Sequence, residues 1–141
     1  MSIVYTGGTF DLFHSGHVNF LRRCRDIAGD QGTVVVGVNS DEFIMRYKKK
    51  APIQTLEERM AVLGACRFVD RVIVNVGEED AKPVLLTVNP NYVVIGSDWA
   101  RKDYYAQMKF TQDWLDQKNI GLIYIPYTKG ISSTQIRDGM R

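Results

Sequence analysis

The chain has 141 residues and a formal net charge of +2 at pH 7. This length suits one domain with a real hydrophobic core, and the near-neutral charge gives no support to a nucleic-acid-binding or membrane-surface protein. No apolar run approaches the ~20 residues of a membrane span, and no signal-peptide pattern opens the chain. Cys24 and Cys66 fall in apolar helical patterns, which indicates reduced core thiols and fits the cytoplasm. We therefore expect one cytoplasmic domain over residues 1–141, without a linker or repeat.

Strand and helix patterns alternate along this domain. Apolar residues 3–5 end in glycines and precede an amphipathic helix pattern that stops at Gly29. Residues 33–39 form a β-branched run without alternation, typical of a strand that is covered on both faces. Further strands are predicted over residues 69–74, 92–95 and 122–126, and further helices over residues 78–88 and 104–118. This alternation predicts an α/β fold, a single Rossmann-like doubly wound domain with five parallel strands.

Capping signals predict three more helices. Ser40 opens a short one over residues 40–43, and the hydroxyl residues 132–134 open the final one. Thr55 and Glu58 fit a capping box at the start of a third helix. The residues of that helix expected to face the core are Met60, Leu63 and Gly64.

Residues 7–17 (GGTFDLFHSGH) carry the strongest functional signal. A strand that ends in glycines lets backbone N–H groups approach a phosphate, and the next helix N-terminus adds donors and partial positive charge. His14 and His17 are the only histidines of the chain, and their i, i+3 spacing brings both rings to one side of this loop. Zinc would need three or four ligands, and neither Cys24 nor Cys66 has the usual spacing, so we expect no metal held by protein side chains.

Three other segments are expected around the same site, because ligands of open parallel sheets lie outside the carboxyl ends of the strands. The basic segment 46–50 (RYKKK) follows the second strand, and segment 96–99 (GSDW) follows the fourth. Segment 130–137 (GISSTQIR) opens the final helix. Its hydroxyl residues are explained by helix capping alone, but opposite the histidine loop they also form a second place for phosphate oxygens.

These motifs together resemble the nucleotidyltransferase superfamily, which includes cytidylyltransferases, small adenylyltransferases and, more distantly, class I aminoacyl-tRNA synthetases. The resemblance runs nearly end to end and is closest to the small cytidylyltransferases of the glycerol-3-phosphate type. The matching segments are Gly8–Asp11, His14–His17, Lys48–Lys50, Gly96–Trp99 and Gly130–Thr134. The resemblance implies the strand order 3-2-1-4-5 and a homodimer.

The resemblance also implies an activity and a set of site residues. The activity is transfer of CMP from CTP to a small phosphorylated alcohol such as glycerol 3-phosphate, with magnesium bridging the phosphates and pyrophosphate released. The catalytic residues would be His14, His17 and Lys49. The nucleotide-binding residues would be Gly8, Thr9, Phe10, Asp11, Gly16, Asp98, Ser132, Ser133 and Thr134, with Asp11 orienting either the loop or the metal. The acceptor side would use Lys48, Arg59 and Trp99.

One position departs from the cytidylyltransferase pattern. Tyr127 stands where those enzymes usually carry an arginine that would contact the triphosphate. Adenylyltransferases that act on sugar phosphates such as heptose phosphate also lack this arginine, and residues 58–63 are similar to theirs, whereas residues 96–99 are of the cytidylyl type. CTP and ATP therefore both stay open as the nucleotide.

Two functions of other classes also stay open. One is a nucleotide-sensing binding module, against which the complete histidine pair argues. The other is a structural subunit of a larger synthase, against which the presence of every motif in one short domain argues.

Overall fold

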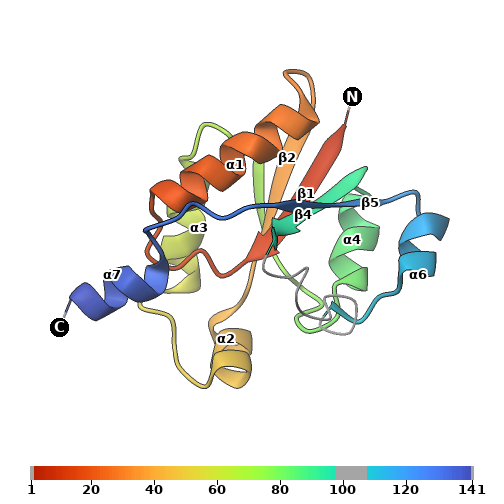
Figure 1. Ribbon diagram of the computed structural model, residues 1–141. Coiled ribbons are helices and arrows are strands. Elements are labelled where there is room, and N and C mark those ends of the chain that lie inside the picture. The colour runs from red at the N-terminus through yellow and green to blue at the C-terminus, as the bar shows by residue number, and fades with distance from the viewer. Residues whose placement is uncertain (1, 98–107, 141) are drawn as a thin grey trace.

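The computed structural model describes residues 2–97 and 108–140. Its strands form one five-stranded sheet in the order β3-β2-β1-β4-β5, which confirms the expected topology (Figure 1). The strands are β1 (Ile3–Gly8), β2 (Thr33–Val38), β3 (Arg71–Val74), β4 (Tyr92–Gly96) and β5 (Gly121–Ile125). The helices are α1 (Ser15–Ala28), α2 (Asp41–Lys48), α3 (Leu56–Gly64), α4 (Lys82–Val88), α6 (Gln112–Gln117) and α7 (Ser133–Gly139).

The sheet is parallel at each of its strand pairs, with β1 at its centre. The register of β1 with β2 runs from Ile3 opposite Thr33 to Gly8 opposite Val38. Beyond that pair, the N–H of Asn39 donates to the carbonyl of Gly8 at 3.0 Å. The glycines of the phosphate loop therefore belong to the strand itself, and the loop begins at the carboxyl edge of the sheet.

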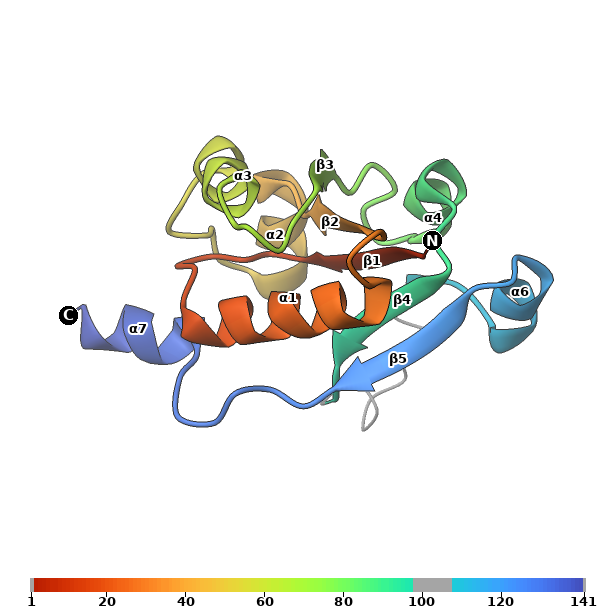
Figure 2. The ribbon, with the colours of Figure 1, turned by 90° about the horizontal axis from the view of Figure 1, so that it is seen from above.

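Two layers of helices cover the sheet, one on each face. Consecutive residues of β2 show the arrangement, because Val34 and Val36 pack with α1 and α3, whereas Val35 packs with α4 and α6. In Figure 1, α1 and α3 lie to the left of the sheet and α4 and α6 to its right; Figure 2 shows the molecule from above. Burial of both faces explains why β2 reads as an unbroken apolar run.

The helix predicted over residues 104–118 is interrupted within its described part. Its first four residues lie outside the described part of the chain, and α6 begins only at Gln112. Thr111 fixes this start, because its side chain accepts a hydrogen bond from the N–H of Trp114 at 3.1 Å. Just before it, Lys109 has a φ of 62°, a left-handed conformation that interrupts a helix.

The helix predicted over residues 78–88 is also shorter and begins at Lys82. Glu78 has a φ of 53°, which is incompatible with a helix at that point. The carboxylate of Asp80 accepts the N–H of Lys82 at 3.0 Å, and Pro83 occupies the first turn. Proline favours the first turn of a helix, so it marked the true start.

Two predictions near β3 are wrong. The strand begins at Arg71 rather than Val69. Asp70 pairs with Val34 through its side chain as well as its backbone, which differs from the pairing of a regular strand. The backbone N–H of Asp70 donates to the carbonyl of Val34 at 2.9 Å. The carboxylate of Asp70 accepts the N–H of Val34 at 2.7 Å. Gly64 was expected to face the core but is exposed at the end of α3.

The short helix predicted over residues 40–43 exists and runs further, to Lys48. Ser40 caps it as predicted, since its hydroxyl accepts the N–H of Phe43 at 3.1 Å. The helix ends at Lys49, whose φ of 62° is left-handed. The basic segment therefore straddles the end of a helix, which fixes the directions of its side chains.

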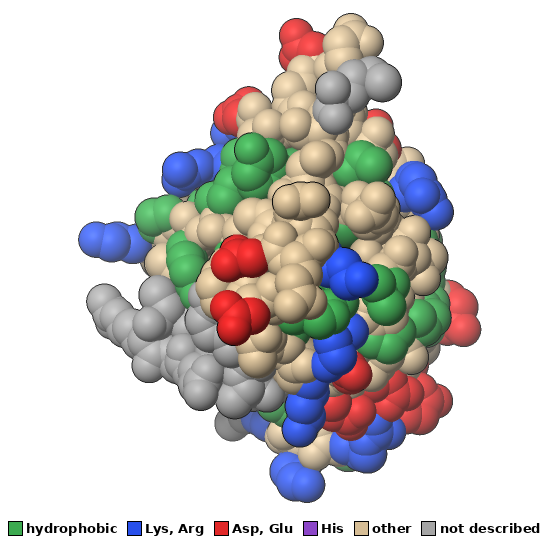
Figure 3. Space-filling model, turned by 90° about the vertical axis from the view of Figure 1, so that its right-hand side faces the viewer, with side chains coloured by type: hydrophobic (Ala, Val, Ile, Leu, Met, Phe, Trp, Pro, Cys, Tyr) green, Lys and Arg blue, Asp and Glu red, His purple; other side chains and the backbone are tan. Residues whose placement is uncertain are grey.

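The surface seen from the side of α4 and α6 carries charges of both signs, and acidic and basic side chains lie together at the lower end of that view (Figure 3). Ion pairs from Arg46 to Glu78 and Glu79 join α2 to the loop after β3.

Cys24 is buried, and burial raises the pKa of its thiol to about 12. Among the described helices, the longest is the 14-residue α1, and none is long and apolar enough to cross a membrane.

Candidate functional site

A cavity of about 800 Å³ lies at the carboxyl ends of the strands. The predicted site residues that line it are Gly8, Thr9, Phe10, Asp11, His14, Gly16, His17, Lys48, Ser132, Ser133 and Thr134. The parallel sheet therefore brings together the histidine loop, the end of α2 and the start of α7, which are far apart in the sequence.

The two histidines start α1 by capping each other. Nδ1 of His14 accepts the N–H of Gly16 at 3.0 Å, and Nδ1 of His17 accepts the N–H of His14 at 3.1 Å. This is a capping box made of two imidazoles, whose ring centroids lie 3.9 Å apart. A Cβ on Gly16 would lie 2.8 Å from Cε1 of His14, so this position needs glycine.

The caps decide which nitrogen of each ring can act on a ligand. A ring nitrogen that accepts an N–H carries no proton, so neutral His14 and His17 both carry their proton on Nε2. Each ring thus offers one N–H donor at the cavity wall. Two adjacent donors at the start of a helix suit an anion such as a phosphate group.

Burial keeps both imidazoles neutral at pH 7. It lowers the pKa of His17 to about 4, with further lowering by the nearby His14 and a smaller opposite effect from Asp11. Burial lowers the pKa of His14 as well. Phe10 and Phe13 flank the ring of His17 at centroid distances of 5.4 and 5.2 Å and contribute to its desolvation.

Asp11 holds two separate segments against the histidine loop. Its side chain is buried and accepts the N–H groups of Ile53 and Gln54, at 2.8 and 2.9 Å, and the guanidinium of Arg137 at 3.0 Å. Its backbone carbonyl accepts a 2.6 Å hydrogen bond from the hydroxyl of Ser133. Burial alone would raise the pKa of Asp11, but these donors outweigh burial and hold it below its usual value. Both carboxylate oxygens are thus engaged in orienting loops.

Arg59, predicted for the acceptor side, has a different place in the structure. Its side chain is 0% exposed and does not line the cavity. It donates hydrogen bonds to three carbonyls and one carboxylate, those of Thr9, Asn39, Gln54 and Asp41. A buried guanidinium needs such partners, and these fix the loops after β1 and β2 from behind. Arg59 therefore braces the cavity wall and has no exposed atom with which to meet an acceptor.

The basic segment also differs from its prediction. Lys49, predicted to be catalytic, ends α2 in a left-handed conformation and does not line the cavity, whereas Lys48 and Lys50 do. Lys48 is exposed, but neighbouring protein atoms partly desolvate its ammonium group and lower its pKa. Repulsion from Arg137 lowers this pKa further, and attraction to Asp11 raises it. Lys48 and Lys50, rather than Lys49, are the lysines at the cavity wall.

The C-terminal motif supplies both structure and cavity wall. The hydroxyl of Ser132 caps α7 by accepting the N–H of Gln135 at 3.1 Å. Ser133 bonds to Asp11 as described, and Thr134 is exposed at the wall. The cap of Ser132 and the bond of Ser133 to Asp11 explain both serines structurally, and residues 132–134 line the same cavity as the histidines.

Sequence reasoning missed several cavity residues. Arg137 lies four residues after Ser133 on α7, a spacing that puts both on one side of a helix and was available as a signal. Asn39 and Asn75 directly follow β2 and β3, and Nδ2 of Asn75 donates to Oδ1 of Asn39 at 3.1 Å. Tyr5 also lines the cavity, and burial raises the pKa of its phenol, but its sequence position on β1 looks like any core residue.

The residues that remain of the predicted site are Asp98 and Trp99, which lie outside the described part of the chain. Within residues 2–97 and 108–140, no group of three or more His, Cys, Asp or Glu is arranged to hold a metal ion. Asp11 is occupied by backbone and guanidinium donors. Magnesium would therefore fit here with phosphate oxygens and water as its main ligands, as is usual for this ion.

The parallel sheet, with paired imidazole donors at the start of its first helix, places the protein among the nucleotidyltransferases. Comparison with known families agrees with this class. Residues 5–139 match the family described as cytidylyltransferase-like, and the chain belongs to that family.

Individual relatives differ in what their names say they make. The chain is 36% identical to the glycerol-3-phosphate cytidylyltransferase of Bacillus subtilis over 98% of this chain and 96% of that protein. It is 31% identical to the FAD synthase of Korarchaeum cryptofilum over 94% of this chain and 87% of that protein. Among solved structures, the lipopolysaccharide core biosynthesis protein of Thermoplasma volcanium superposes with a TM-score of 0.70 at 27% identity, covering 92% of this chain and 99% of that one. The family is thus established, and the substrates differ within it.

The depressed pKa of His17 predicts a loss of stability in mild acid. Its pKa is about 4 in the folded protein and about 6.5 in an unfolded chain. Between these values the unfolded chain binds a proton that the folded protein does not, so stability falls as the pH falls through this window. We expect a loss on the order of 3 kcal/mol, measured by urea unfolding at several pH values.

The control for this titration is His17→Asn, which keeps a hydrogen-bond acceptor near Nδ1 and cannot gain a proton. The free energy of unfolding of this variant should depend less on pH across the same window. Equal pH dependence in the two proteins would show that His17 keeps an ordinary pKa.

Proposed function

We propose that the protein transfers CMP from CTP to a small phosphorylated alcohol such as glycerol 3-phosphate, releasing pyrophosphate. The observation that carries this proposal is the capping by His14 and His17, which leaves two neutral imidazole N–H donors in the cavity that Lys48 and Lys50 also line. The choice of CTP and of this acceptor is supported by the similarity to the Bacillus subtilis enzyme, which extends over nearly the whole of both chains.

The proposed reaction needs no general base. A phosphate monoester is already an anion at neutral pH, so one of its oxygens attacks the α-phosphorus of CTP directly. A new P–O bond forms while the bond from the α-phosphorus to the oxygen that bridges to the β-phosphate breaks. Pyrophosphate leaves with that electron pair, no proton moves, and a CDP-alcohol is the product. Catalysis then consists of positioning and of stabilising the charge on the phosphate oxygens.

The cavity residues fit these two tasks. In the proposal, the Nε2–H groups of His14 and His17 donate to α- and β-phosphate oxygens as negative charge develops. The hydroxyls of residues 132–134 and the backbone of residues 8–10 hold the nucleotide, and Lys48 faces the acceptor phosphate. Magnesium would enter with the triphosphate and neutralise part of its charge.

Adenylyl transfer to a sugar phosphate is the second candidate function. It is favoured by Tyr127, which lies at the cavity wall in place of the arginine of the cytidylyltransferases. The similarity to a FAD synthase is also consistent with a different nucleotide. A nucleotide-binding module without turnover is the alternative from another class.

The test is pyrophosphate release by the purified protein with magnesium. CTP and ATP are each combined with glycerol 3-phosphate, heptose phosphate and phosphoethanolamine. We expect turnover with CTP and glycerol 3-phosphate. Turnover only with ATP and a sugar phosphate would replace the proposal by its alternative, and nucleotide binding without any pyrophosphate release would favour the binding module.

Two substitutions of His17 separate its capping role from its catalytic one. Asparagine retains an acceptor for the N–H of His14 but lacks the Nε2–H donor, whereas alanine lacks both. We expect both variants to lose about a hundredfold or more in turnover, on the scale of removing an oxyanion donor. Only His17→Ala should also lose about 1 kcal/mol of stability, as measured by urea unfolding. Full turnover by a folded His17→Asn protein would remove this donor from the mechanism.

Adjacent lysines provide a matched pair for the acceptor side. Lys48→Ala should raise the KM for the acceptor about tenfold, because it removes a charged hydrogen bond to phosphate. Lys49→Ala removes the same charge one residue away, outside the cavity wall, and should change this KM less than about twofold. Initial rates over a range of acceptor concentrations measure both. Equal effects of the two substitutions would mean that only the general positive charge of the segment matters.

A further inference from the structure

The wall of the cavity changes character from one side to the other. On the side of α2 the lining residues include Lys48, Lys50 and the two asparagines after β2 and β3, together with Phe43, Ile44 and Tyr47 of α2 itself. On the side of β4 and β5 they are Ile95, Gly96, Met108, Phe110 and Tyr127. The first side suits a phosphate group, and the second suits an uncharged, planar one.

Tyr127 lies directly over the backbone of Gly96. A Cβ built on Gly96 would lie 2.1 Å from Cζ and 2.3 Å from the hydroxyl oxygen of Tyr127, so a side chain there would displace the ring. Tyr127 is nevertheless 54% exposed and lines the cavity. The ring is therefore supported by backbone at the end of β4 and still has surface left for a ligand.

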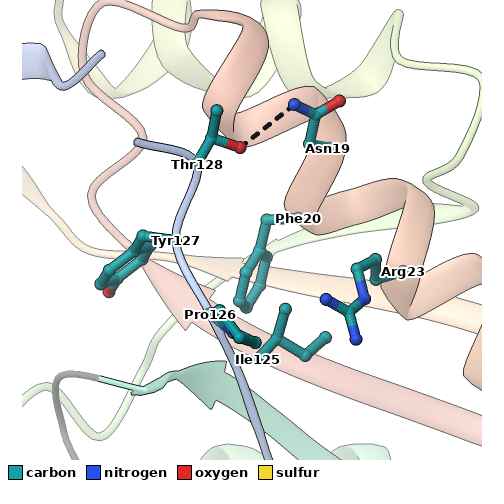
Figure 4. A pocket seen from close by; sticks show the side chains of 7 residues that line it. All are labelled: Asn19, Phe20, Arg23, Ile125, Pro126, Tyr127 and Thr128. Atoms are coloured by element: carbon teal, nitrogen blue, oxygen red, sulfur yellow. Dashed lines mark hydrogen bonds between the residues drawn. The ribbon is translucent and has the colours of Figure 1, made fainter. Parts of the chain in front are cut away.

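The segment that carries Tyr127 is fixed on both sides of it. Ile125 before it is 2% exposed in the core, and Pro126 has a restricted φ. On the other side of Tyr127, the hydroxyl of Thr128 accepts a 3.1 Å hydrogen bond from Nδ2 of Asn19 on α1. Figure 4 shows the consequence: the ring of Tyr127 and the side chain of Arg23 extend to opposite sides of this segment. Arg23 lines a smaller cavity of about 260 Å³, which shares Phe20, Tyr127 and Thr128 with the larger one.

We propose that Tyr127 is the platform on which the nucleobase stacks. This inference rests on the proposed nucleotidyl transfer and names the residue that holds the base end of the nucleotide. A flat aromatic ring held against backbone loses little conformational freedom on binding, and stacking of a base on such a ring is favourable for every base. The position that holds an arginine in the cytidylyltransferases thus recognises the base in this chain instead of the triphosphate.

Charge explains why the base rather than the acceptor meets this ring. The phosphorylated acceptor carries its charge to Lys48, on the other side of the cavity, and the triphosphate is drawn to the paired histidines between the two sides. The base is the uncharged, planar part of the two substrates. Of the apolar parts of the wall, the one formed by Tyr127 and its neighbours lies away from Lys48, so we place the base there.

The test compares the binding of CTP with that of inorganic tripolyphosphate, which has the phosphates but no base. Isothermal titration calorimetry with magnesium gives both dissociation constants for each variant. Tyr127→Leu should weaken CTP binding about tenfold and leave tripolyphosphate binding within about twofold. Tyr127→Phe, which keeps the ring and loses the hydroxyl, should bind CTP within about twofold of the original protein.

Tyr124→Leu is the matched control, because Tyr124 is an exposed tyrosine of β5 that does not line the cavity. It should bind both ligands as the original protein does. The proposal would be overturned if Tyr127→Leu bound CTP normally, or if it weakened tripolyphosphate as much as CTP. Equal losses in Tyr127→Phe and Tyr127→Leu would also overturn it, because they would assign the effect to the hydroxyl group.

This experiment is independent of turnover. If no nucleotide and acceptor pair released pyrophosphate, the proposed function would fail while the binding constants still reported on Tyr127. If turnover occurred as proposed but CTP bound no more tightly than tripolyphosphate, the base platform alone would fail.

Discussion

The buried carboxylate of Asp11 is the contact on which the arrangement of the site depends. It joins the histidine loop to the turn at residues 53–54 and to Arg137, which is 126 positions further along the chain. An unpaired carboxylate would be costly to bury, so the loop, the turn and α7 must be in place together. The dependence is strongest for α7, which has no buried residue of its own and is held largely through Ser133 and Arg137.

Other polar groups of the site are likewise held by several hydrogen bonds. Arg59 braces the cavity from behind with four hydrogen bonds, and the imidazoles of His14 and His17 cap the start of α1 and line the cavity. Donors held in this way need not reorganise when charge develops on a phosphate, which is the source of most electrostatic catalysis. Neutrality of the imidazoles supports this preorganisation. Only a neutral ring can accept the capping N–H at Nδ1, and this contact fixes the direction of the Nε2–H.

The division of the cavity wall gives the proposed reaction a direction. An anionic acceptor near Lys48 and a base on Tyr127 would lie on opposite sides of the histidine pair, with the α-phosphate between them. This division separates the two substrates, whereas in-line displacement requires pyrophosphate, and not the base, to leave opposite the acceptor. It also places Tyr127, which differs from the cytidylyltransferase pattern, next to the base, the part by which CTP and ATP differ.

The sequence by itself determined the alternation of strands and helices, the helix caps and the place of the histidine loop, because periodicity, capping and glycine conformation are local properties of the chain. Tertiary structure decided which charged residues line the cavity. Arg59 and Lys49 look like site residues in the sequence, yet Arg59 is enclosed by carbonyl groups, and Lys49 sits at the left-handed end of α2 and does not line the cavity. Arg137 and Tyr127 reach the cavity through contacts with Asp11 and Gly96, which no local pattern encodes, since they depend on strand order and on the packing of segments distant in sequence.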